Sequence, residues 1–215
     1  MDYPYTSENR LEAPHAYMYA PFKGRTFFDA YFADRQKALA QYSDEGGCAN
    51  MLRSEMRDIA LLGAELPQLP SAEMLGEFSP QLEVSTLDLL SAILALQANG
   101  DCGEGIKLWL DRLVQRFEVT KKLYASYPPG FRKGDGPADS LVLYWMLAMA
   151  LYLHFEDTGG LKYLNTGLKL TDLLCSLPAE NVADELPRCA MPLLLRAEVR
   201  MLGELIGKEV DDGAC

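Results

Sequence analysis

The sequence has too few basic residues for a protein that binds nucleic acid along its backbone. Its 215 residues include 20 Lys and Arg against 31 Asp and Glu, so the formal net charge is -11. Binding to phosphates is carried by an excess of Lys and Arg that this chain lacks. We therefore expect no nucleic-acid partner.

Cysteine is sparse and scattered. The five cysteines are an odd number and form no C-x-x-C pair. A disulfide framework or a zinc site would show a tighter, paired spacing. We expect reduced thiols, no metal and no cofactor.

No apolar run is long enough to cross a bilayer. The longest, 141–153, has 13 residues, whereas a membrane-spanning helix needs about 20. The first 22 residues lack the basic stretch followed by an apolar one that marks a secretory signal. The sequence predicts a cytoplasmic protein with no membrane contact, in which 141–153 belongs to a buried central helix.

The sequence also lacks the pattern of strands, which is an alternation of polar and apolar residues over five or more positions. Most segments show the spacing of apolar residues that is typical of helices. We expect an all-α fold of about seven helices in stacked antiparallel hairpins, as a bundle or a short α-solenoid-like array. The expected organisation is an irregular, aromatic-rich N-terminal arm (1–24), a single helical domain (25–207) and a polar C-terminal tail (208–215).

Apolar stripes and turn residues place the helices along the chain. Ser85 followed by Asp88 is typical of a helix N-terminus, and Pro192 is expected near the start of the last helix. The segments expected to hold helices are 25–47, 48–66, 85–101, 103–127, 138–157, 159–178 and 186–207, with a proline-broken loop and one short helix over 67–84.

A faint internal repeat joins two of these helix pairs. A shift of 55 residues lays 85–115 on 140–170 with six identities in 31 positions. The second copy, with Trp145, Ala148, Tyr152 and the Gly159-Gly160 turn, resembles a tetratricopeptide hairpin. It departs from that family in its period, which should be 34 residues, and in Leu161, where the family has alanine. The resemblance implies stacked helical hairpins and assigns no binding residues.

Basic residues gather in one region of this acidic chain. Residues 106–133 contain seven cations and two acids, a net +5, which leaves -16 for the remainder. Arg112 and Arg116 lie one turn apart, and Arg132 and Lys133 follow in the glycine- and proline-rich loop 127–140. Arg and Lys beside a glycine-rich loop can hold a phosphate or a carboxylate. The alternative is that these cations favour a helix C-terminus and pair with the acidic remainder.

Two charged residues interrupt apolar stripes. Arg35 shares a stripe with Phe28 and Phe32, and Glu55 shares one with Leu52 on the next expected helix. A buried ion pair between them would make a polar pocket in the first hairpin, with Asp58 as a second carboxylate. The alternative is that each side chain extends outward to water at the edge of its face.

The candidate for catalysis is His154, which stands before Glu156 and Asp157. A histidine beside carboxylates can act as a general base, but no nucleophile is placed near it in the sequence. A capping or core-edge role is the alternative. His154 does not follow a glutamate in the Glu-x-x-His pattern that di-iron bundles carry on two helices.

These observations favour a helical interaction or adaptor module that binds a partner protein or peptide. Its contact surface would be an apolar or aromatic groove, with the arm residues Tyr3, Tyr5, Tyr17 and Tyr19 among its lining. The alternative is a small helical enzyme or ligand-binding domain for an anionic metabolite, using Arg112, Arg116, Arg132 and Lys133. The apolar last helix would also allow a homodimer.

Overall fold

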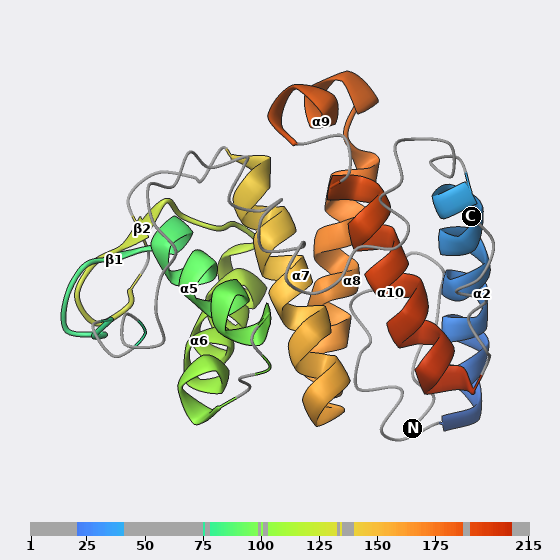
Figure 1. The fold of residues 1–215 in the computed structure, drawn as a ribbon, viewed down its shortest axis with the longest axis horizontal. Coiled ribbons are helices and arrows are strands. Elements are labelled where there is room, and N and C mark those ends of the chain that lie inside the picture. The colour runs from blue at the N-terminus through green and yellow to red at the C-terminus, as the bar shows by residue number, and fades with distance from the viewer. Residues whose placement is uncertain are drawn as a thin grey trace.

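The fold is helical, as predicted. The computed structural model describes residues 21–40, 75, 78–98, 100, 103–132, 134, 140–186 and 190–207. These hold seven helices and one two-stranded antiparallel sheet (Figure 1). The elements are α2 (Pro21–Ala40), β1 (Val84–Ser85), α5 (Thr86–Ala98), α6 (Glu104–Thr120), β2 (Ser126–Tyr127), α7 (Leu141–Thr158), α8 (Leu161–Ser176), α9 (Ala179–Glu185) and α10 (Ala190–Ile206).

Helix α7 forms the centre of the molecule, because neighbours pack on several of its sides. It lies against α5, α8 and α10, and every residue from 142 to 155 is buried. The Trp145 indole N–H donates to the Ala190 carbonyl oxygen at 2.7 Å, which ties α7 to the start of α10. The prediction of a buried central helix is confirmed. No helix in the described segments has the length and apolar character to span a membrane.

Helix α2 lies at the far end from α5 and α6 and packs on α10 (Figure 1). Its stripe of Phe28, Tyr31 and Phe32 is buried, as predicted. The helix begins at Pro21, inside the segment assigned to the arm. The rest of the arm, the helix expected over 48–66 and the C-terminal tail lie outside the described residues.

Helix α6 is shorter than its apolar stripe predicts. It ends at Thr120, because Lys121 adopts a left-handed conformation (φ 55°) and closes the helix with a backbone N–H bond to Phe117. Tyr124, predicted on the helical stripe, is buried instead just before β2. β1 and β2 pair Val84 with Tyr127, and each is too short to show alternation in the sequence.

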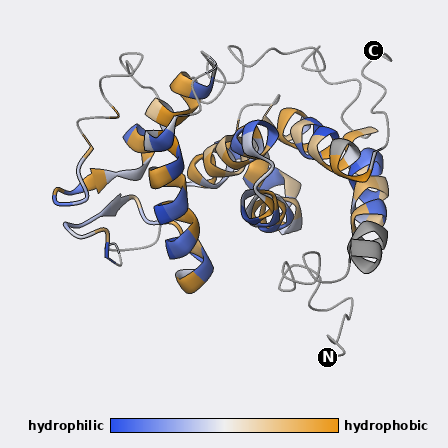
Figure 2. Cartoon of the chain, turned by 90° about the horizontal axis from the view of Figure 1, so that it is seen from below, coloured by the Kyte–Doolittle hydropathy of each residue, from blue (hydrophilic) through white to orange (hydrophobic). Residues whose placement is uncertain are grey.

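The predicted repeat is visible in the order of the helices but not in their packing. α5 and α7 start at positions related by the 55-residue shift, and the Ser85 hydroxyl caps the Asp88 N–H as expected. α7 and α8 form a close hairpin across Gly159-Gly160, whereas α5 packs on α7 rather than on α6. Seen from below, hydrophobic and hydrophilic residues alternate along the helix drawn beside the two strands (Figure 2).

Candidate functional site

The predicted site residues fall in two separate regions. Arg112, Arg116 and Arg132 lie on or beside α6, and Arg35 lies on α2. Lys133 and Glu55 lie outside the described residues. Each region is therefore described from the side chains that surround its arginines.

On the side of α6 that faces α8, the charges pair. Asp111 accepts from Lys162 at 2.5 Å and from the Tyr163 hydroxyl at 2.7 Å, and it also pairs with Lys107. Burial alone would raise the pKa of Asp111, but the hydrogen bonds and charges of these partners hold it below its ordinary value. Lys107 therefore binds an acid of the basic region itself, and Lys162 binds the same acid from α8.

A second acidic residue repeats this arrangement two turns later. Glu118 binds Lys121 and Lys169, each at 2.8 Å, and the Thr166 hydroxyl at 3.1 Å. Burial opposes the ionised form, yet the two lysines lower the pKa of Glu118 overall. Asp111 and Glu118 are seven residues apart and share one side of the helix. Both carboxylates on this side are therefore neutralised by lysines.

The arginines occupy the next side of α6 and have no such partners. Arg112 and Arg116 are four residues apart, so they point the same way. Within the described chain neither makes an ion pair, and the buried Nε of Arg112 has no hydrogen-bond partner. The Arg112 guanidinium lies over the Trp109 ring at 5.4 Å instead. This contact holds the guanidinium in place without neutralising it.

The loop after β2 is a packed connector whose described part has a fixed conformation. Phe131 is 2% exposed and stacks on Tyr127 at 4.2 Å, with Trp109 at 5.6 Å on another side. Its backbone is left-handed (φ 49°), a conformation that costs energy for a bulky residue and that the surrounding rings must maintain. Arg132 follows directly and is exposed, again with no ion pair among the described residues.

A glycine beyond Arg132 fixes the chain on its other side. Gly134 is buried against Tyr124, and a Cβ at this position would clash with the Ser126 carbonyl oxygen. No larger residue fits there unless the backbone moves. Phe131, the residue before Arg132, packs on Trp109, and Arg112 lies over the Trp109 ring.

Exposed apolar side chains lie on the same helix as the unpaired arginines. Leu108 is 49% exposed and Val119 is 75% exposed, and their spacing of 11 residues, about three turns, puts them on one side. We call the residues Leu108, Arg112, Gln115, Arg116 and Val119 the outer face of α6. This face combines unpaired cations with apolar groups in a protein whose net charge is strongly negative.

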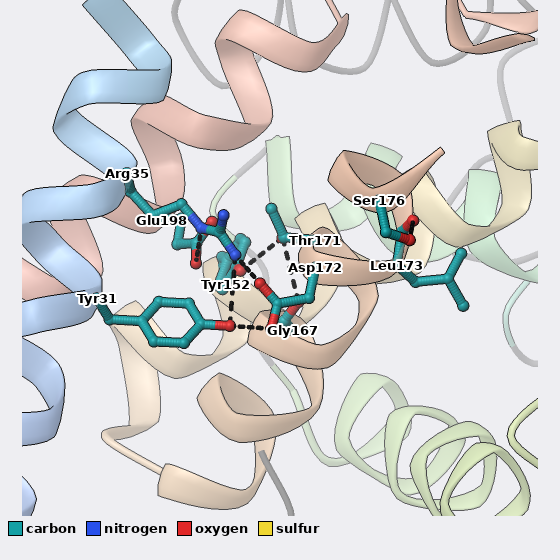
Figure 3. Close-up of polar contacts among 9 residues, drawn as sticks. All are labelled: Tyr31, Arg35, Tyr152, Gly167, Thr171, Asp172, Leu173, Ser176 and Glu198. Carbon is teal, nitrogen blue, oxygen red and sulfur yellow. Dashed lines mark hydrogen bonds and ion pairs between the residues drawn. The ribbon is translucent and has the colours of Figure 1, made fainter. Parts of the chain in front are cut away.

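The second region is an ionic centre between α2, α8 and α10 (Figure 3). Arg35 donates through Nε to Glu198 Oε1 at 3.0 Å and through Nη2 to Asp172 Oδ1. The Tyr31 hydroxyl donates to the other Asp172 oxygen, and the Arg35 guanidinium lies 4.8 Å from the centre of the Tyr31 ring. We call Tyr31, Arg35, Asp172 and Glu198 the Arg35 centre.

Arg35 is buried and pairs with carboxylates from two other helices. The Arg35 side chain is only 11% exposed, so it does not extend into water. Its carboxylates come from Asp172 and Glu198, which lie 137 and 163 residues away in the sequence. The sequence suggested Glu55 as a partner because it lies on the neighbouring expected helix, and Glu55 lies outside the described residues.

Glu198 was missed, although the sequence held a signal for it. The side chain is fully buried, and Leu194, Leu195, Met201 and Leu202, at three and four residues on either side, are buried too. A carboxylate on such a stripe needs a partner. The same test that singled out Arg35 would have singled out Glu198.

His154 lies inside the core rather than at a reactive surface. It is fully buried, neither ring nitrogen has a hydrogen-bond partner among the described residues, and it meets the Tyr163 ring edge-on at 4.5 Å. Burial lowers its pKa, so the neutral form is favoured. Glu156 pairs with Arg200. This placement fits a core role and supplies no partner for proton transfer.

Comparison with known proteins adds no assignment. The chain matches no known family model, no curated protein and no solved structure. Across the described segments no three His, Cys, Asp or Glu side chains gather closely enough to hold a metal ion. Cys175, the one cysteine that the structure describes, is a free thiol.

Proposed function

We propose that this protein is an interaction module that binds an acidic segment of a partner protein on the outer face of α6. The observation that carries the proposal is the division of charge on this helix. The lysines of α6 and its C-cap, Lys107 and Lys121, are paired with carboxylates, whereas Arg112 and Arg116 have none among the described residues. Arginine is common at the centres of protein interfaces.

The chemistry of the face specifies the partner. Unpaired guanidinium groups attract carboxylates, and complementary charge speeds association and selects the partner. Leu108 and Val119 add apolar area that a small anion would not cover. A segment with acidic residues and one or two apolar residues at helical or extended spacing would use both kinds of contact. We further place this partner in the cytoplasm, where the free thiol of Cys175 would stay reduced.

One observation favours a second candidate, a site for an anionic metabolite. The Nε of Arg112 is buried and unpartnered, and a phosphate or carboxylate oxygen placed there would accept a charge-assisted hydrogen bond. We assign Arg132 to the same site, because it follows Phe131, which packs on the Trp109 ring beneath Arg112. The two functions differ in the role of Leu108 and Val119: a partner segment would cover these apolar side chains, whereas a small anion would not.

Selection from a random peptide library displayed on phage, with the whole protein as bait, tests the first proposal. We expect the enriched peptides to combine Asp or Glu with apolar residues and to lose affinity as salt is raised. Enrichment of neutral or basic peptides would contradict the proposal.

A thermal-shift screen against phosphorylated and carboxylated metabolites tests the second candidate. A ligand present at 100 times its dissociation constant stabilises the fold by about 2.7 kcal/mol, which is readily measured. A dose-dependent shift that disappears in Arg112→Ala would favour the metabolite site. A flat screen together with acidic peptides from the selection would leave the interaction module as the function.

A further inference from the structure

The Arg35 centre contains more negative groups than its single cation can neutralise. One guanidinium lies between two carboxyl groups, Asp172 and Glu198. With both ionised the centre would carry a net charge of -1. Asp172 is 30% exposed and has water on one side, whereas Glu198 is fully buried. The excess charge is therefore most costly on Glu198.

The hydrogen bonds leave one oxygen of Glu198 unused. Arg35 Nε bonds to Oε1, while Oε2 is buried and has no hydrogen-bond partner in the described chain. Both Asp172 oxygens, in contrast, accept a bond, one from Arg35 and one from Tyr31. A proton on Oε2 would remove the unpaired charge and leave the bond at Oε1 intact.

Among the described residues, the groups around Glu198 supply no other compensating charge. Tyr31 and Arg35 come from α2, and Asp172 and Cys175 come from α8. Tyr152 comes from α7, where its hydroxyl is bonded to Thr171 at 2.8 Å. Burial raises the pKa of Tyr31 and Tyr152, and it raises that of Cys175 to about 11. These three groups therefore stay protonated and neutral around neutral pH.

We propose that Glu198 is a proton-binding site that controls how firmly α2 is held on α8 and α10. With the proton bound, the centre is neutral and Arg35 is shared between its two partners. When the proton leaves, a buried negative charge appears on Glu198 beneath α2, and the packing of α2 on α8 and α10 is weakened. This inference concerns the opposite end of the molecule from α6 and does not depend on the proposed function.

The pKa of Glu198 agrees in direction with this charge count. Burial raises it from 4.5 to about 8, although Arg35 acts to lower it. An unfolded chain gives up this proton near the ordinary value, so the folded protein holds one proton more between about pH 5 and pH 8. Stability must therefore decline as pH rises through this window and become level above it.

The experiment compares wild type with Glu198→Gln, which copies the protonated carboxyl in shape. Hydrogen exchange would give protection factors for the amides of α2 between about pH 6 and pH 9. In wild type we expect these factors to fall with pH, by up to about tenfold per pH unit where the proton is released. In Glu198→Gln they should stay level. Glu180→Gln, on the exposed face of α9, is the matched control and should follow wild type.

A second variant keeps the test decisive if Glu198→Gln does not fold. Asp172→Asn removes the other carboxylate and leaves one cation with one acid. Ionised Glu198 then has Arg35 to itself, so its pKa should fall and the decline in protection should move to lower pH or disappear from this range. Level protection of α2 in wild type over the whole range would overturn the proposal. The same decline in wild type and Glu198→Gln would also overturn it.

Discussion

At the scale of single residues, the buried guanidinium of Arg35 needs a carboxylate, and two other helices supply it. Arg35 stood out because it interrupts an apolar stripe, and it is indeed buried. Its partner Glu198 lies 163 residues away, and nothing in the stripe of one helix tells which other helix will cover it. Composition and spacing therefore predict that a buried charge exists, while the identity of its partner requires the tertiary structure.

His154 gives a prediction at this scale. Its pKa is lowered by burial, so the unfolded chain takes up a proton below about pH 6.5 before the folded protein does. Stability should therefore fall as pH decreases from about 7 to 5 because of this residue. His154→Leu removes two unpaired ring nitrogens from the core and should flatten that fall, measured as the urea midpoint at each pH.

The other histidine serves as the control for this measurement. His15→Ala reports any contribution of that residue to the same pH range. Equal slopes for wild type and His154→Leu would contradict the core role that we assign to His154. Because Glu198 has the opposite pH dependence, the comparison uses the difference between variant and wild type rather than the wild-type curve alone.

At the scale of elements, helices were predictable but their ends were not. The apolar stripe of α6 continues in register to Tyr124 in the sequence, yet the helix ends at Thr120 because Lys121 turns left-handed. Glycine usually marks such a position, and a lysine gives no warning of it. The basic region that includes α6 could be identified from the charge count, whereas the sequence did not tell which of its cations pair with Asp111 and Glu118.

The outer face of α6 gives the prediction at this scale. The double variant Leu108→Ser, Val119→Ser removes both apolar groups. Each substitution should change the free energy of unfolding by about 0.5 kcal/mol or less, because both side chains are exposed. If a partner segment covers them, the affinity for a selected acidic peptide should fall about tenfold or more. Titration calorimetry of the peptide and chemical unfolding of the protein measure the two effects separately.

A matched control for this pair lies on another helix. Leu205 on α10 is 38% exposed, and Leu205→Ser removes a similar apolar group far from α6 in the sequence. It should leave the peptide affinity unchanged. If Leu205→Ser weakens binding as much as the α6 pair does, the apolar contact is not on the outer face of α6.

At the scale of the whole molecule, the order of the helices was predictable and the way they assemble was not. The all-α class follows from periodicity, and the buried central helix follows from the apolar run at 141–153. The packing of α5 on α7, and of α2 on α10 across most of the chain, depends on shape complementarity that a single sequence does not display. The packing of the helices places Arg112 and Arg116 on α6, apart from the Arg35 centre between α2, α8 and α10.

The most direct test of the account compares two triple variants that lose the same charge. Arg112→Ala, Arg116→Ala and Arg132→Ala remove three cations that have no carboxylate partner in the described chain, whereas Lys107→Ala, Lys121→Ala and Lys162→Ala remove three that are paired. The measurement is the affinity of each variant for the same selected acidic peptide. We predict a loss of at least about 100-fold for the arginine variant and little change for the lysine variant. Each hydrogen bond to a charged group contributes about 1.5–3 kcal/mol, and about 2.8 kcal/mol already corresponds to 100-fold. Equal losses would show that only overall charge matters and would contradict a binding site on the outer face of α6.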